Sequence, residues 1–382
     1  MHKVWNGMRM LLVSALLAVT GAHAGTSVVS GALRVDTVAA GLDTPWSLAF
    51  LPDGRMLVTE RPGRLRVVSA DGQVSAPVRG VPAVHAVGQG GLLDVALSPD
   101  FARNGQIFLS FAQATAGGAR TVVVRAVLDA DALALSAVRP VFAQRDDPPG
   151  GHHFGSRLAF APDGTLFITL GERSAYRDAA QDLASHLGKI VRVNPDGSIP
   201  ADNPFVGRAD VRPEIWSWGH RNVQGAAIDP RTGRLWTHEH GPQGGDELNQ
   251  PAAGANHGWP VITYGREYVT GRAIGAGTTR ADVRPPRHQW TPSIAPSGMA
   301  IYRGDLFPAW RHSVFVGSLK FGTLHRLQRD GERVLGEEVL LAGITRRIRD
   351  VREGPDGALM LLDESGGRVL RVVPAEAAPL GR

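Results

Sequence analysis

Two adjacent histidines stand at the start of the stretch with the most chemical potential, GGHHFGSRLAFAPDGTLFITLGE, residues 150–172. His152 and His153 precede an apolar strand, a Pro-Asp-Gly turn and a second apolar strand. Because adjacent side chains of an extended stretch face opposite ways, one histidine can face a pocket while the other packs elsewhere. We expect the nearby Arg157 to keep that histidine neutral and able to take a proton. A surface or core-packed histidine pair is the alternative.

A second group lies in GHRNVQG and THEHGPQGGDE. Arg221 and Asn222 combine a forked cation with an amide, which suits a planar ligand bearing carboxylates. His238 and His240 lie two apart and could bind zinc, although no third ligand is evident. The Gly-Pro pair at 241–242 instead predicts exposed backbone carbonyls, which suit calcium.

Three cations near the C-terminus complete the set. Only three of the 41 basic residues are lysines, so Lys320 in VGSLKFG, expected inside a strand, suggests a role for a compact ammonium. Arg347 and Arg349 alternate onto one strand face and need an anionic partner, whereas Asp350 faces away.

The elements that must position these residues repeat along the chain. Six segments, starting at residues 46, 92, 156, 223, 297 and 348, each read as an alternating apolar strand, a turn rich in Pro, Asp and Gly, and a second strand. Their uneven spacing predicts long insertions in repeats of about 40–50 residues. We predict an all-β, six-bladed β-propeller closed by pairing of residues 33–39 with 368–373. The alternative architecture is two stacked sandwich domains. Helical periodicity is scarce, and a short helical turn is expected near residues 178–187.

Equivalent strand ends of a propeller converge on one funnel. Each residue singled out above lies at or beside the first strand of a repeat, or in the loop before it, as does Gln89 in GQGGLLD. The predicted pocket therefore holds Gln89, His153, Arg221, Asn222, Lys320, Arg347 and Arg349. Its four cations indicate a polyanionic small-molecule ligand.

The N-terminus and composition limit the setting. Lys3 and Arg9, an apolar run to about Val19 and Ala22-His23-Ala24 predict a signal peptide over residues 1–24, with residues 25–382 as a single propeller domain. A membrane anchor is the alternative. Cysteine is absent, which excludes disulfides and thiolate sites. The chain has no run of five or more like charges, so its charge pattern does not indicate nucleic-acid or membrane binding. We expect a soluble periplasmic or secreted protein, by default a monomer.

Across nearly the whole mature chain, the motifs PWSLAFLPDGRMLVTERPGRLRVV, GQGGLLDVALSPDF, HFGSRLAF, WSWGHRNVQG, EHGPQGGDELN, NHGWP and RIRDVREGPDG resemble the glucose/sorbosone dehydrogenase family. The resemblance is to its soluble aldose sugar dehydrogenases, which use pyrroloquinoline quinone (PQQ) on a six-bladed propeller. It implies oxidation of aldoses at the anomeric carbon to lactones, with electrons passed to an external carrier. Lysine and paired arginines suit PQQ, a tricarboxylic ortho-quinone.

The resemblance also implies roles for individual residues. His153 matches the general base, and His152 stands where the glucose enzymes have aspartate. Gln89 matches a pocket residue, and the matches to PQQ contacts are Arg221, Asn222, Lys320, Arg347 and Arg349. Gly241 and Pro242 match carbonyls that hold the cofactor's Ca²⁺, while Glu247 and the His257 backbone resemble a second calcium site. A calcium-dependent sugar lactonase and a non-catalytic ligand-binding propeller are the competing hypotheses.

Overall fold

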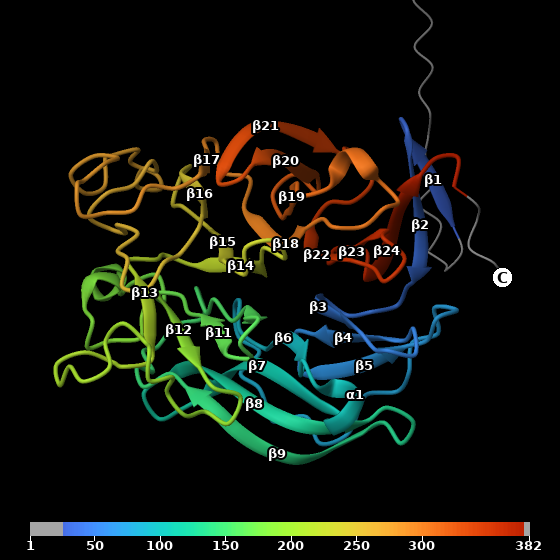
Figure 1. The fold of residues 1–382 in the computed structure, drawn as a ribbon, viewed down its shortest axis with the longest axis horizontal. Helices are drawn as coiled ribbons and strands as arrows, with labels where there is room; N and C mark the ends of the chain where they lie inside the picture. The colour runs from blue at the N-terminus through green and yellow to red at the C-terminus, as the bar shows by residue number, and fades with distance from the viewer. Residues whose placement is uncertain (1–25, 378–382) are drawn as a thin grey trace, which may run out of the picture.

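The protein is a ring of six antiparallel sheets, described by a computed structural model over residues 26–377 (Figure 1). The predicted six-bladed β-propeller is therefore confirmed. The predicted signal peptide lies outside the described residues.

Each sheet forms one blade, numbered here along the chain. Blade 1 contains β3 (Pro45–Phe50), β4 (Met56–Glu60) and β5 (Arg64–Val68). Blade 2 contains β6 (Leu92–Leu97), β7 (Gln106–Ala114), β8 (Ala119–Asp129) and β9 (Ala134–Ala143), with α1 (Phe101–Asn104) between its first two strands. Blade 3 contains β10 (Leu158–Phe160), β11 (Leu166–Thr169), β12 (Lys189–Val193) and β13 (Ile215–Trp218).

Blade 4 contains β14 (Val223–Ile228), β15 (Leu235–Glu239), β16 (Asp246–Asn249) and β17 (His288–Trp290). Blade 5 contains β18 (Pro296–Ile301), β19 (Val314–Ser318), β20 (Leu324–Asp330) and β21 (Arg333–Leu340). Blade 6 contains β22 (Ile348–Glu353), β23 (Leu359–Asp363), β24 (Arg368–Pro374), β2 (Leu33–Ala39) and β1 (Ser27–Ser30). The 3₁₀ helices are η1 (Arg177–Gln181), which overlaps the helical turn expected near residues 178–187, and η2 (Pro308–Trp310).

The ring closes by strand pairing between the two ends of the chain. Strand β2 pairs antiparallel with β24, from Leu33 opposite Pro374 to Ala39 opposite Val369. Figure 1 shows this join as a blue strand beside a red one. The prediction for residues 33–39 and 368–373 is confirmed, and closure leaves no blade edge free at the join.

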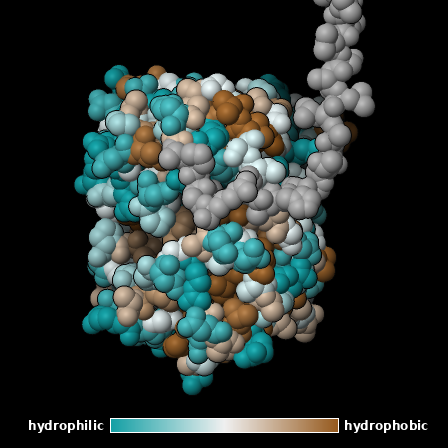
Figure 2. All heavy atoms as spheres, turned by 90° about the vertical axis from the view of Figure 1, so that its right-hand side faces the viewer, coloured by the Kyte–Doolittle hydropathy of each residue, from teal (hydrophilic) through white to brown (hydrophobic). Residues whose placement is uncertain are grey.

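Six separate apolar clusters fill the spaces between neighbouring blades. Their members come from the buried faces of alternating strands, for example Leu57 in β4 and Leu109 in β7 between blades 1 and 2. The cluster between blades 3 and 4 has the fewest buried members. On the outer side that Figure 2 shows, hydrophilic residues predominate and hydrophobic ones form separate groups.

A buried ion cluster joins the innermost strands near the axis. Arg157, just before β10, lies 3.3 Å from Asp94 of β6 and 3.1 Å from Asp350 of β22. Arg352 contacts the same two carboxylates at 3.1 and 2.9 Å. The guanidinium of Arg157 also stacks 4.0 Å from the Trp46 ring. Blades 2, 3 and 6 are thus held together by Arg157, Asp94 and Asp350, which have almost no exposure to solvent, and by the partly exposed Arg352.

Candidate active site

A cavity of about 340 Å³ opens among the loops that precede the innermost strands. It brings together three of the predicted site residues, Gln89, Arg347 and Arg349. The other lining residues are Trp46, Arg61, Gly88, Leu93, Phe154, Gly155, Gln224, His240, Ala295, Leu319 and Glu364. The loops differ in length, but the first residues of the innermost strands converge at one end of the ring because these strands run in the same direction in every blade.

The arginine pair shares one carboxylate. Arg347 Nε lies 2.9 Å and Arg349 Nη2 lies 3.2 Å from Glu364 Oε2, so the predicted anionic partner is Glu364. Burial alone would raise the pKa of Glu364, but the two arginines outweigh burial and lower it. Arg349 Nε is buried and has no acceptor among the described residues. Two cations against one carboxylate leave positive charge for an anionic ligand.

His153 is buried beside this cavity and is held at both its backbone and its ring. Its N–H donates to the side chain of Gln89 (2.8 Å), and Nδ1 lies 3.0 Å from Glu172 Oε1. Its φ of 53° departs from the extended backbone expected for this stretch. Glycine is required at 171, because a Cβ there would lie 2.1 Å from the His153 carbonyl oxygen.

The electrostatic surroundings keep His153 neutral. Burial lowers the pKa of His153 below its ordinary 6.5, the Glu172 hydrogen bond opposes this, and the charge of Arg221 adds to the lowering. With Nδ1–H donated to the Glu172 carboxylate, the neutral ring presents the Nε2 lone pair. This geometry is that of a general base oriented by a carboxylate.

Arg157 does not have the role expected from the sequence. It belongs to the axial ion cluster with Asp94 and Asp350, and the arginine whose charge acts on His153 is Arg221. A different arginine, Arg173, fixes the histidine loop by donating to the carbonyls of His152 (2.8 Å), Ala119 and Gly150. Burial lowers the pKa of Arg173 to about 10.

Arg221 and Asn222 flank the cavity rather than line it. Arg221 Nη1 donates to the Gly241 carbonyl (2.7 Å), and its backbone N–H donates to Glu239. Asn222 Oδ1 accepts from the Gly155 N–H and from the Gln224 amide, both at 3.2 Å. These bonds place the Arg-Asn pair against two of the residues that line the cavity.

Two predicted positions are more exposed than the others. The prediction that Lys320 lies inside a strand is wrong: β19 ends at Ser318, and Lys320 is exposed in the turn to β20. Its neighbour Leu319 lines the cavity, whereas the Lys320 ammonium lies 5.0 Å from the Phe321 ring. His152 is also exposed, with its ring 6.4 Å from that of His153.

A small hollow beside Arg221 contains two buried carboxylates, Glu239 and Glu247, which are paired across β15 and β16. Burial raises the pKa of both, and the neighbouring Glu239 charge raises that of Glu247 further. Asn249 donates to both, while its own Oδ1 is buried without a donor. The backbone of His257 and the Gly241 and Pro242 backbone lie in the same region. Adjacent acids with an unpaired oxygen suit a hard cation.

Two further observations concern metals and membranes. Over residues 26–377 no group of three or more His, Asp or Glu side chains is arranged to hold a metal ion. His240 Nε2 contacts the Pro296 carbonyl at 2.7 Å, so this nitrogen is engaged and not free for zinc. Within the same range no helix is long and apolar enough to span a bilayer.

Three carboxylates of this site, unlike Glu247, were not predicted from the sequence. Glu172 ends the LGE motif, Glu239 lies between His238 and His240, and Glu364 follows β23. The signal for Glu239 was its position between His238 on β15 and His240 directly after that strand. No local signal pairs Glu364 with arginines about 15 residues earlier, because the contact depends on the fold of blade 6.

Comparison with known proteins supports the fold and the class of enzyme. The sequence profile named Glucose / Sorbosone dehydrogenase matches residues 42–371, and the chain belongs to this family of oxidoreductases. Aldose sugar dehydrogenase YliI of Escherichia coli is 45% identical over 346 residues, covering 90% of this chain and 93% of YliI.

Two solved structures extend the comparison. The apo form of the soluble aldose sugar dehydrogenase from Escherichia coli superposes with a TM-score of 0.87 at 46% identity, covering 90% of this chain and 99% of the other. The PQQ-bound aldose sugar dehydrogenase of Streptomyces coelicolor superposes with a TM-score of 0.73 at 32% identity, covering 91% and 99%. The dehydrogenase interpretation is thereby favoured over the lactonase and binding-propeller alternatives.

Proposed function

We propose that this protein oxidises aldoses at the anomeric carbon to lactones, using PQQ as cofactor and His153 as the general base. The observation that carries the proposal is the adjacency of an oriented, neutral His153 to a cavity with an incompletely neutralised arginine pair. The PQQ-bound relative supports the choice of cofactor.

The residues present fit a planar polyanion. Arg347 and Arg349 line the cavity, Arg349 Nε lacks an acceptor among the described residues, and the exposed Lys320 follows the lining residue Leu319. Charge-assisted bonds from these groups would hold the PQQ carboxylates. Asn222 and Arg221 are expected to complete the cofactor contacts. When bound, PQQ supplies an ortho-quinone that accepts two electrons and a proton from the sugar.

The chain's own residues then handle the substrate proton. The Nε2 of His153 would take the proton of the C1 hydroxyl, while Glu172 stabilises the imidazolium that forms. Gln89, already bonded to the His153 backbone, is placed to orient the sugar, and His152 would contact it at the mouth. General-base catalysis of this kind contributes roughly 10²–10⁴ in rate.

Calcium is proposed at two places. The carbonyls of Gly241 and Pro242 would hold one ion at the cofactor, where it would supply a Lewis acid. Gly241 already accepts from Arg221, but a carbonyl oxygen has a second lone pair. Glu247 and the His257 backbone, with Glu239, would hold a second, structural ion that offsets the repulsion of the two acids.

We further propose that residues 1–24 direct export, that residues 25–382 form one monomeric periplasmic or secreted domain, and that an external carrier takes up the electrons. The test of the oxidation proposal is product identity. Purified mature chain, loaded with PQQ and Ca²⁺, should convert glucose to its δ-lactone, followed by NMR with an artificial electron acceptor. Unchanged glucose under these conditions would overturn the proposal.

A further inference from the structure

A larger cavity, of about 560 Å³, lies between blades 3 and 4. Its walls include the β10–β11 turn and the β14–β15 turn. These turns follow β10 and β14, whereas His153 and Asn222 precede the same two strands. It opens beside the smallest of the six core clusters. It is therefore separate from the candidate active site, and its size is typical of small-molecule sites.

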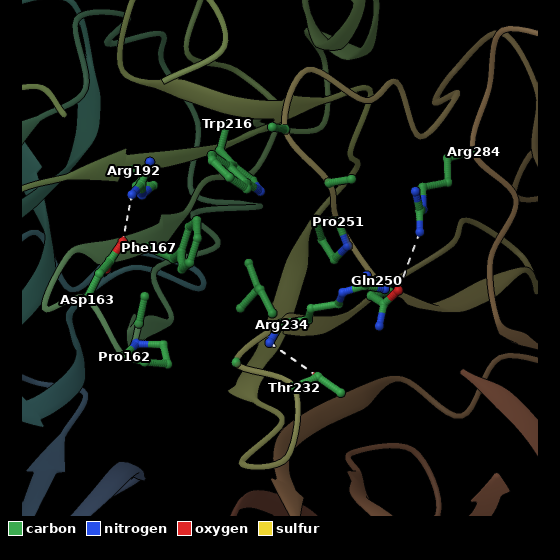
Figure 3. A pocket seen from close by; sticks show the side chains of 15 residues that line it. Pro162, Asp163, Phe167, Arg192, Trp216, Thr232, Arg234, Gln250, Pro251 and Arg284 are labelled. Atoms are coloured by element: carbon green, nitrogen blue, oxygen red, sulfur yellow. Dashed lines mark hydrogen bonds and ion pairs between the residues drawn. The ribbon is translucent and has the colours of Figure 1, made fainter. Parts of the chain in front are cut away.

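One wall of the cavity is aromatic. Phe167 and Trp216 meet edge to face with centroids 5.3 Å apart, and Figure 3 shows Pro251 across the space from them. The indole Nε1 of Trp216 is buried and donates to no acceptor among the described residues. The aromatic rings form a flat apolar wall, which suits the C–H groups of a sugar ring.

Three arginines line the cavity, and they differ in how they are paired. Arg192 is neutralised by Asp163 (2.7 Å) and Asp202 (2.9 Å), and Arg234 pairs with Glu332. Arg284 has no carboxylate within ion-pair distance in residues 26–377. It is the cation in this cavity that is left to meet a ligand.

The remaining contact of the Arg284 guanidinium is weak. Its Nη2 lies 3.4 Å from Gln250 Oε1, the contact drawn in Figure 3. The Gln250 amide pairs better with oxygen and nitrogen exchanged, since it then donates to Glu332 (2.8 Å) and accepts from Trp236 (3.3 Å). In that orientation Gln250 offers Arg284 no acceptor. Arg284 Nε is likewise buried and has no partner within residues 26–377.

We propose that this cavity binds a monosaccharide carboxylate, with the carboxylate on Arg284 and the sugar ring against Trp216. Thr232, Gln250 and Asp163 also line the cavity, and such a polar lining matches a polyhydroxylated ring better than a purely aromatic acid. The proposal concerns binding alone and does not depend on the oxidation proposed above.

The test is calorimetric titration of the PQQ-loaded full chain with methyl β-D-glucuronide. This probe carries the ring and the carboxylate but has no free anomeric hydroxyl to oxidise. Two control ligands are titrated in the same way: methyl β-D-glucoside, which lacks the carboxylate, and benzoate, which lacks the sugar ring. We expect the glucuronide to bind at least roughly tenfold more tightly than either.

Matched variants locate the site. Arg284→Gln should weaken glucuronide binding roughly tenfold or more, whereas Arg272→Gln, at an exposed arginine outside the cavity, should leave it unchanged. Trp216→Ala should weaken binding, and Trp216→Phe should retain most of it. Oxidation of glucose should be unaffected in all four.

Several outcomes would overturn the proposal. These are no binding of the glucuronide, equal binding by Arg284→Gln and the unaltered chain, equal affinity for methyl glucoside or benzoate, or loss of binding in Arg347→Gln but not in Arg284→Gln. The last result would place the glucuronide in the arginine-lined cavity of the candidate active site. If Arg284→Gln does not fold, comparison of Trp216→Ala with Trp216→Phe shows whether the glucuronide binds in this cavity.

Discussion

The Nδ1 of His153 lies 3.0 Å from Oε1 of Glu172, and both side chains are almost completely shielded from solvent. This contact selects the ring tautomer with its free lone pair on Nε2. Glu172 is in turn linked to Arg221, because its N–H donates to the Arg221 carbonyl at 2.9 Å. The orientation of the proposed base thus depends on blades 3 and 4 together.

Replacing Glu172 with glutamine should lower kcat. The amide can present an N–H to Nδ1, which would favour the tautomer with its proton on Nε2 and remove the basic lone pair. We expect a loss of roughly 10²–10⁴ in kcat, with PQQ affinity within about threefold of the unaltered chain. Steady-state kinetics and a PQQ titration measure both quantities. Glu267→Gln, at an exposed ion pair, is the control, and a near-normal kcat for Glu172→Gln would contradict the role of Glu172.

Activity should depend on pH through His153. Protonated His153 cannot accept a proton, so kcat/KM should fall as pH decreases through the His153 pKa. Burial and Arg221 lower that pKa, which places the midpoint of the acid limb below pH 6.5. Because Glu172 raises the His153 pKa, Glu172→Gln should move the midpoint to still lower pH. A midpoint above 6.5, or a shift in the opposite direction, would argue against His153 as the base.

Cofactor affinity should depend on the arginine pair. Arg347→Gln removes a cation that lines the cavity, and Arg346→Gln removes an exposed neighbour of the same charge. We expect the first to weaken PQQ binding roughly tenfold or more and the second to change it little. Absorbance titration of each apo variant with PQQ gives the comparison. Equal affinities would remove Arg347 from the cofactor site.

The axial ion cluster should matter for stability. Arg157→Met leaves Asp94 and Asp350 buried with Arg352 as their remaining guanidinium partner, so we expect a loss of about 3 kcal/mol in the free energy of unfolding. Arg55→Gln, at the more exposed pair with Asp53, should cost about 1 kcal/mol or less. Urea unfolding followed by circular dichroism measures both. Similar losses in the two variants would show that the cluster contributes no more than a surface pair.

Calcium should stabilise the unaltered chain through Glu247. Adding Ca²⁺ after chelation should raise Tm, because the ion offsets the repulsion between Glu239 and Glu247. Glu247→Gln should abolish most of that increase, while Glu338→Gln, at an exposed surface pair, should preserve it. Differential scanning calorimetry measures the shift. An equal increase in Glu247→Gln would place the stabilising ion elsewhere.

Much of the fold could be predicted because it is encoded locally. Each strand-turn-strand unit carries its own alternation and its own turn residues, and the pairing of Leu33–Ala39 with β24 follows from the need to close the ring. The site was harder to predict. Gln89, Arg347 and Arg349 converge as expected because they occupy equivalent strand ends.

Two predictions were wrong and one contact was missed, because neighbouring positions in the sequence do not determine tertiary contacts. Arg157 was assigned to His153 from sequence proximity, but the positive φ at His153 turns its ring toward Glu172. Lys320 was predicted to lie inside a strand, but β19 already ends at Ser318. Glu364 could not be paired with Arg349 in advance, because that contact forms only when β22 and β23 lie side by side.

Dye-linked oxidation of several aldoses, using purified mature chain with and without PQQ and Ca²⁺ alongside the His153→Ala variant, tests the PQQ-dependent mechanism directly. We expect dye reduction only when both additions are present, and a rate roughly 10²–10⁴ lower in the PQQ-loaded variant. Dye reduction without PQQ, no reduction with it, or near-normal turnover by His153→Ala would contradict this mechanism.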